Sequence, residues 1–133
     1  MQIDEKNPYY QIIQLGHDIT HVKDVDIQCA ATESAVQEFV ADCDAIYCTF
    51  CLDVLPASVA PGVSAPSGLG VPLYRAIELL RLVLAECRRG TRDKLLMADV
   101  AEFNPLHDAD DARTARAAAR LVYELADLGR SCE

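Results

Sequence analysis

A short run of apolar and β-favouring residues at positions 45–52 places the tightest constraint on how this chain folds. The run is too short for a buried helix, and it lacks the polar alternation of a half-exposed strand. Strands buried on both faces of a parallel sheet have this composition. We therefore predict that residues 45–52 form a central strand of a parallel sheet.

Helical patterns flank this strand on both sides. Upstream, residues 34–42 carry apolar side chains at helical spacing, and Ser34 with Gln37 fits a capping box. Downstream, residues 73–88 place Ile77, Leu80 and Leu84 on one face, and Gly90 supplies a stop signal. Both segments are predicted to be helices that pack against the sheet.

Three further segments complete the predicted order of elements. Residues 10–15 and 94–100 have strand character, and the Ala-rich residues 109–128 are predicted to form a long helix. The order β-α-β-α-β-α predicts a parallel sheet with right-handed crossovers and helices on its faces. With 133 residues, half of them apolar, one α/β domain over residues 1–133 is expected.

The net charge of −9 argues against two classes of partner. An acidic chain is not drawn to nucleic-acid backbones or to anionic membrane surfaces. No apolar run approaches the roughly 20 residues that span a bilayer, and residues 1–6 lack the form of a signal peptide. We expect a cytoplasmic protein that binds a small molecule; assembly as a homo-oligomer is left open.

Six cysteines raise the alternatives of disulfides, redox chemistry and a zinc site. Nothing in the sequence signals export, which favours reduced thiols. Cys48 and Cys51 form a C-x-x-C pair, but residues three apart on a strand point to opposite faces. No second such pair accompanies them, so a zinc site is the weaker interpretation.

Two carboxylates follow the strands at positions where parallel sheets bind ligands. Asp53 follows the first strand and Glu102 the second, so neighbouring parallel strands would bring both to one rim. Converging carboxylates suit a divalent cation or proton transfer, although caps and solvated loop residues have the same appearance. Asp99, inside its strand, is predicted to be a structural carboxylate satisfied by backbone or hydroxyl donors.

The loop between these carboxylates, residues 55–72, contains four prolines, three glycines and little charge. Long loops of this kind are uncommon in compact domains, and ordered ones are usually functional. We predict that the loop is ordered without a helix or hairpin, because its low charge favours packing beneath its neighbours.

Two segments of the chain resemble signature blocks of the arginase family of metal-dependent amidine hydrolases. Residues 49–66 match a block that runs Ser/Thr, apolar, Asp-x-Asp, Pro and Pro-Gly-x-x-x-Pro; residues 98–105 match an Asp-x-x-Glu-x-Asn-Pro block. Residues 55–66 and 108–121 are most similar to the formimidoylglutamase branch. The resemblance covers roughly residues 20–128 and implies the C-terminal portion of a three-layer αβα fold with two manganese ions at the sheet's carboxyl edge.

Three site residues are assigned by this resemblance. Asp53 matches the second carboxylate of Asp-x-Asp, and Cys51 stands where the family has the first, which bridges both metals. A thiolate is a softer ligand than a carboxylate and suits zinc better than manganese, so metal identity and full activity are left open. Glu102 matches the acidic residue beside the substrate's amidine group, and no residue is assigned as catalytic.

The resemblance implies a hydrolase that cleaves the amidine C–N bond of N-formimidoyl-L-glutamate to glutamate and formamide in histidine degradation. An upstream Gly-rich His loop and an Asp-Ala-His-x-Asp block, which supply the family's remaining ligands, have no match in the chain; His17 and His21 do not fit that block. We therefore expect the isolated chain to be inactive. An arginase or agmatinase, or a non-catalytic remnant of the fold, are the alternatives.

Overall fold

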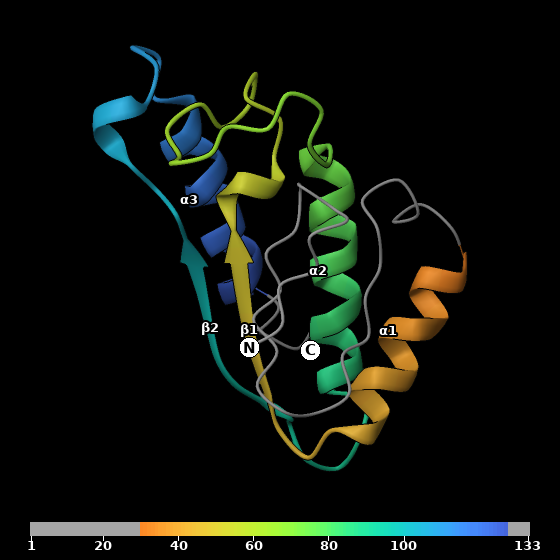
Figure 1. Ribbon diagram of the computed structural model, residues 1–133. Helices are drawn as coiled ribbons and strands as arrows, with labels where there is room; N and C mark the ends of the chain where they lie inside the picture. Colours follow the sequence, from red (N-terminus) through yellow and green to blue (C-terminus); the bar gives the residue numbers. More distant parts are fainter. Residues whose placement is uncertain (1–29, 128–133) are drawn as a thin grey trace, which may run out of the picture.

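The computed structural model describes residues 30–127, in which helices alternate with two strands (Figure 1). The elements in chain order are α1 (Ala30–Asp42), β1 (Ile46–Cys51), the 3-10 turn η2 (Leu52–Val54), α2 (Leu73–Cys87), β2 (Leu95–Ala101), the 3-10 turn η3 (Pro105–His107) and α3 (Arg113–Asp127). The predicted strand at residues 10–15 and the two histidines at 17 and 21 lie outside the described residues.

The two described strands are parallel neighbours, as predicted. Thr49 pairs with Asp99 and Cys51 with Ala101, and α2 forms the crossover between the strands. The pairing register of the two strands shifts between Ile46 and Tyr47, near the start of β1. Both strands end at the same edge, so the residues that follow them share one rim.

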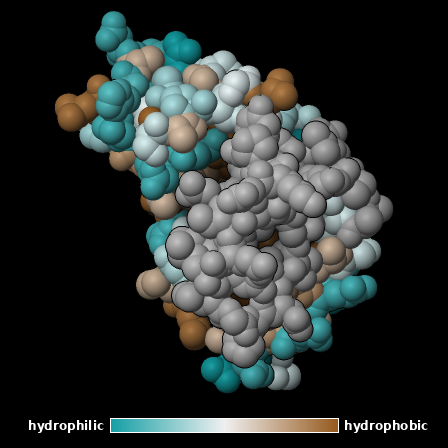
Figure 2. All heavy atoms as spheres, viewed as in Figure 1, coloured by the Kyte–Doolittle hydropathy of each residue, from teal (hydrophilic) through white to brown (hydrophobic). Residues whose placement is uncertain are grey.

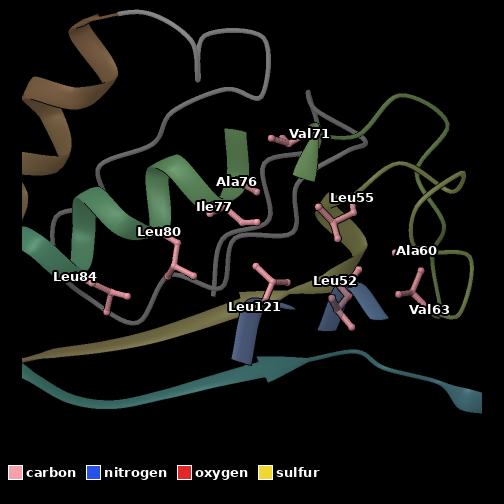
Figure 3. Packing of buried hydrophobic residues seen from close by; sticks show 11 residues of the cluster. Leu52, Leu55, Ala60, Val63, Val71, Ala76, Ile77, Leu80, Leu84 and Leu121 are labelled. Atoms are coloured by element: carbon pink, nitrogen blue, oxygen red, sulfur yellow. The ribbon is translucent and has the colours of Figure 1, made fainter. Parts of the chain in front are cut away.

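One hydrophobic core joins the sheet to α2, α3 and the long loop (Figure 3). Leu84 of α2 and Leu121 of α3 are fully buried, as is Leu52 at the end of β1. The predicted apolar face of α2 is confirmed, because Ile77, Leu80, Leu84 and Cys87 are all buried. Removing this much apolar surface from water is the main stabilising contribution in a domain of this size.

The expectation that the first strand is buried on both faces is wrong for the described residues. Cys48 and Phe50 pack on the core, but Tyr47 on the opposite face is 54% exposed, and Thr49 and Cys51 are exposed too. The reason is that α2 and α3 share the core on one side of the sheet. The described residues thus supply the sheet and one helical layer of the predicted three-layer arrangement.

Two helix starts differ from the sequence prediction. The described part of α1 already includes Ala30, so Ser34 lies inside the helix and does not cap it. Residues 30–33 contain no turn signal, and their helix propensity carries the helix through Ser34. α3 begins at Arg113 and not at 109, because Ala112 has a positive φ of 54° that a helix cannot accommodate.

The loop at residues 55–72 is ordered and contains no helix or hairpin, as predicted. Its apolar side chains Leu55, Ala60, Val63 and Val71 are buried in the core. Gly70, with φ of 60°, lies so close to Pro56 that a Cβ would be 2.3 Å from the Pro56 nitrogen. Glycine is therefore required where the loop passes over its own beginning.

The surface of the described residues is mixed. On the face shown in Figure 2, hydrophobic side chains form separate patches among hydrophilic ones. Within residues 30–127, no helix has the length and apolar character needed to cross a membrane.

Candidate functional site

Asp53 lies directly after β1, in the turn η2, and has an unusual environment. Its Oδ1 atom is buried and accepts no hydrogen bond within the described part of the chain. Burial raises the pKa of Asp53, and the nearby negative charge of Glu102 raises it further. A buried carboxylate oxygen without a protein donor is rare in folded proteins, and a bound cation or water is what such an oxygen normally contacts. Asp53 is therefore suited to bind a cation through this oxygen.

Cys51 is the last residue of β1 and lies on the exposed face of the sheet. Burial of the sulfur raises the pKa of the Cys51 thiol; the Asp53 backbone N–H opposes this, and the charges of Asp53 and Glu102 add to it. The protonated thiol is thus favoured at neutral pH. Metal ions bind the thiolate form of cysteine, so the protonated Cys51 thiol is a poor metal ligand unless it loses its proton.

Glu102 follows β2 and reaches the same rim. Its backbone has a φ of 70°, a left-handed conformation that is uncommon for a residue with a side chain. Such strain costs on the order of 1–3 kcal/mol and is concentrated at functional sites. The Ser64 hydroxyl donates a hydrogen bond of 2.7 Å to Oε2 of Glu102, so the loop contacts this carboxylate directly.

A hydrogen-bond network fixes the loop beside Glu102. The Gly62 N–H donates to the buried Thr114 hydroxyl at 2.8 Å, and the Gly62 carbonyl accepts from Asn104 N–H at 2.8 Å. A Cβ at Gly62 would be 3.0 Å from the Asn104 carbonyl oxygen and from Asp108. The loop, the β2–α3 connection and the start of α3 are therefore held as one unit.

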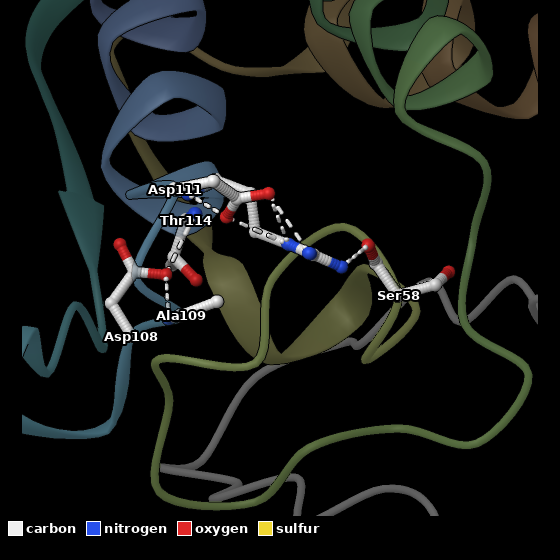
Figure 4. A network of polar contacts seen from close by, with 6 residues as sticks. Ser58, Asp108, Ala109, Asp111 and Thr114 are labelled. Atoms are coloured by element: carbon white, nitrogen blue, oxygen red, sulfur yellow. Dashed lines mark hydrogen bonds and ion pairs between the residues drawn. The ribbon is translucent and has the colours of Figure 1, made fainter.

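Asp108 is the acceptor that closes this unit (Figure 4). Its carboxylate accepts hydrogen bonds from the backbone N–H groups of Ala109, Thr114 and Ala115. Burial alone would raise its pKa, but hydrogen bonds from the Thr114 side chain and these three amides outweigh it and lower the pKa to about 2. Asp108 is thus a structural carboxylate that caps α3.

Arg113 links the same unit to Ser58, near the start of the loop. Its guanidinium pairs with Asp111 at 2.8 Å and donates to the Ser58 carbonyl at 3.3 Å (Figure 4). The pair lowers the pKa of Asp111, chiefly through the hydrogen bond from Arg113. The side chain of Arg113 therefore fastens the loop to the first turn of α3.

The described residues fit part of the expected metal centre. Within residues 30–127, no group of three or more His, Cys, Asp or Glu side chains is arranged to hold a metal ion. The buried, donor-free Oδ1 of Asp53 fits one contact to a hard cation. Cys51 offers a protonated thiol, and Glu102 is engaged by Ser64. A complete centre for two manganese ions does not fit these residues alone.

The strands that precede Asp53 and Glu102 are parallel neighbours that end at one edge of the sheet, as predicted. The negative charge of Glu102 contributes to the raised pKa values of Asp53 and Cys51. Asp99 accepts hydrogen bonds from the hydroxyls of Tyr47 and Thr49, as predicted, although it is half-buried and not fully buried. Sequence reasoning did not find Ser64 or Thr114, because neither contact has a local pattern. The cap formed by Asp108 was also missed, since the predicted start of α3 is too early.

Comparison with known proteins places these features in a wider context. The chain matches the Arginase family over residues 2–127. It is 48% identical over 92 residues to formimidoylglutamase of Vibrio vulnificus strain YJ016, which covers 69% of this chain and 26% of the relative. It is 47% identical over 113 residues to formimidoylglutamase of Salmonella arizonae, covering 85% and 33%. The chain thus spans about a quarter to a third of the length of these curated relatives.

Solved structures with the same fold include two hydrolases. Trypanosoma cruzi formiminoglutamase with Mn²⁺ superposes with a TM-score of 0.55 at 29% identity, covering 77% of this chain and 32% of that one. Arginase from Bacillus subtilis has a TM-score of 0.62 at 22% identity, covering 77% and 35%. The second likeness concerns the fold alone.

Proposed function

Because this chain belongs to the arginase family, we propose that it forms the C-terminal portion of a formimidoylglutamase-type hydrolase acting in the cytosol. The complete enzyme would cleave the amidine C–N bond of N-formimidoyl-L-glutamate to glutamate and formamide in histidine degradation. The observation that carries the proposal is the buried Oδ1 of Asp53, which has no donor among residues 30–127, at the edge where two parallel strands end and close enough to Glu102 to feel its charge.

Each carboxylate would have a different task. Asp53 would contribute one oxygen to a bound manganese ion, and metal ions held at such a centre would supply Lewis-acid chemistry for hydrolysis. Glu102 would pair with the cationic amidine nitrogens, because charge-assisted hydrogen bonds to carboxylates are strong and directional. The Pro/Gly loop holds the second of these groups in place through Ser64.

The choice of substrate rests on the curated relatives. Two of those with high similarity carry the name formimidoylglutamase at 47–48% identity, whereas Bacillus subtilis arginase shares the fold at 22%. An arginase-type or agmatinase-type activity is the first alternative, and such an enzyme would differ in the groups that bind the substrate tail. A non-catalytic remnant is the second alternative, favoured by the thiol of Cys51 at the position of a bridging carboxylate.

The isolated chain should release no formamide. Asp53 and Cys51 would provide too few ligands for two ions, and manganese favours oxygen-rich coordination. The test is formamide release from N-formimidoyl-L-glutamate by the purified chain with added Mn²⁺. Cys51→Asp restores one oxygen ligand only, so this variant is expected to be inactive as well. Turnover above a metal-only control that Asp53→Asn abolishes would contradict the inactivity.

The binding of Mn²⁺ by the purified chain gives a second test that does not depend on turnover. If Asp53 is a ligand, the purified chain should bind Mn²⁺ weakly, and Asp53→Asn should weaken that binding further. Electron paramagnetic resonance of free Mn²⁺ measures both. Equal binding by the wild-type chain and by Asp53→Asn would remove Asp53 from the site, and with it the main support for the hydrolase assignment.

A further inference from the structure

We infer that Ser64 is a positioning residue that aims the carboxylate of Glu102 at the amidinium group of the substrate. This inference rests on the proposed function, because it assigns a role beside the residue proposed to bind the amidine. The direct observation is the hydrogen bond of 2.7 Å from Ser64 Oγ to Glu102 Oε2.

The backbone on both sides of this contact is fixed. Gly62, two residues before Ser64, is bonded through its N–H to Thr114 and through its carbonyl to Asn104. Asn104 in turn lies two residues after Glu102. The hydroxyl and the carboxylate are therefore presented by segments that are tied to each other, which is the arrangement expected of a prepared binding group.

Ser64 also counteracts two tendencies of Glu102. The backbone of Glu102 has a φ of 70°, a conformation that persists only where the surroundings hold it. In addition, the negative charges of Glu102 and Asp53 repel each other across the rim. A side chain on the surface would relax away from such a neighbour, and the Ser64 hydroxyl opposes that relaxation.

The hydrogen bond leaves a defined part of the carboxylate for a ligand. Ser64 bonds Oε2, and among residues 30–127 no hydrogen bond reaches Oε1. A planar amidinium presents N–H donors that match carboxylate oxygens in one plane. Fixing Oε2 orients the plane of the Glu102 carboxylate. The side chain then keeps one rotamer, in which Oε1 is directed at the ligand.

The inference can be tested on the full chain with formamidinium chloride as the probe and tetramethylammonium chloride as a cation without N–H donors. Binding is followed by NMR at the backbone amide and side-chain carboxyl carbon of Glu102. Ser64→Ala should weaken formamidinium binding roughly three- to tenfold, the range expected for one hydrogen bond. Ser64→Thr, which keeps the hydroxyl, should bind within about twofold of wild type.

Matched variants separate positioning from stability. Ser58→Ala removes an exposed serine hydroxyl of the same loop and keeps the carbonyl that Arg113 contacts, so binding should not change. The unfolding midpoint of Ser64→Ala should equal that of wild type, while the carboxyl carbon resonance of Glu102 shifts. Neither Ser64→Ala nor Ser58→Ala should change the binding of tetramethylammonium.

Glu102→Gln distinguishes the role of Ser64 from the role of Glu102. If this variant loses formamidinium binding while Ser64→Ala binds as tightly as wild type, Ser64 is not a positioning residue and the role of Glu102 stands. If Glu102→Gln binds like wild type, the substrate role of Glu102 in the proposed function fails, and the inference about Ser64 fails with it. Loss in both variants, with recovery in Ser64→Thr, supports the inference.

Discussion

Asp53 and Asp108 are carboxylates at the same end of the molecule, yet their surroundings are opposite. Asp108 accepts three backbone hydrogen bonds and has its pKa lowered to about 2. Asp53 has a buried oxygen to which no group in the described part of the chain donates, and its pKa is raised by burial and by Glu102. Among residues 30–127, the carboxylate of Asp108 is satisfied by backbone donors, whereas one oxygen of Asp53 has no donor.

The difference indicates that Asp108 has a structural role and Asp53 a binding role at the same end of the molecule. The hydrogen bonds that join the loop at residues 55–72 to the start of α3, through Thr114 and Arg113, are made within the fold, so they contribute to stability. Just after the end of β1, Oδ1 of Asp53 is buried with no donor among residues 30–127, an arrangement that costs stability and suits an oxygen that binds a ligand. Substitutions in the two regions should therefore change stability in opposite directions.

The largest effect is expected in the loop, from Gly70→Ala. A Cβ at this position would be 2.3 Å from the Pro56 nitrogen and would require a left-handed backbone of a residue with a side chain. We expect a loss of about 3 kcal/mol or more in the free energy of unfolding, measured with urea. Gly68→Ala is the control, because nothing lies within 4 Å of its added Cβ. Equal stability of both variants would show that the loop is not tightly fixed.

A smaller loss is expected from Thr114→Val. The substitution keeps the shape of the fully buried Thr114 side chain, but it leaves the buried N–H of Gly62 without its acceptor and removes the hydroxyl that bonds Asp108. The cost should be about 1–3 kcal/mol in urea unfolding. Thr114→Ser retains the hydroxyl and should recover most of this loss. If Thr114→Val were as stable as wild type, the loop would not depend on α3.

These contacts also show which features could be predicted from the sequence. The strands at β1 and β2 were predictable because their apolar runs are bounded by turn signals, and parallel pairing then brings Asp53 and Glu102 together. The bonds from Thr114 to Gly62 and from Ser64 to Glu102 join residues 52 and 38 positions apart. Such contacts depend on how the loop folds over the rim, and no local pattern encodes that.

The helix starts illustrate a second limit of sequence reasoning. Ser34 with Gln37 has the pattern of a cap, yet α1 already includes Ala30. At α3 the true cap, Asp108, lies five residues before the helix and reaches its N–H groups through a turn at Ala112. Capping patterns record local preference only: helix propensity carries α1 through Ser34, and the turn at Ala112 sets the start of α3.

The Asp108 cap should make stability depend on pH. A carboxylate whose folded pKa is lowered stabilises the fold above its ordinary pKa of 3.8, and this contribution is lost as the pH falls toward about 2. Asp108→Asn should therefore be less stable than wild type at pH 7, and the difference should shrink between about pH 4 and pH 2. Urea unfolding at several pH values measures this. Asp110→Asn is the control, and a difference that persists at pH 2 would exclude the charge as its cause.

The smallest effect, and the one of opposite sign, is expected from Asp53→Asn. The folded pKa of Asp53 is raised above 3.8, so its ionised form costs stability at neutral pH, and that cost disappears as the pH falls below the ordinary value. Solvent reaches this half-buried side chain and limits the gain, so Asp53→Asn should be as stable as wild type or more stable by up to about 1 kcal/mol at pH 7. Urea unfolding without metal measures the change, with the exposed Asp44→Asn as control. A loss comparable to that of Asp108→Asn would mean that Asp53 is a structural carboxylate after all, and that the fold satisfies both carboxylates alike.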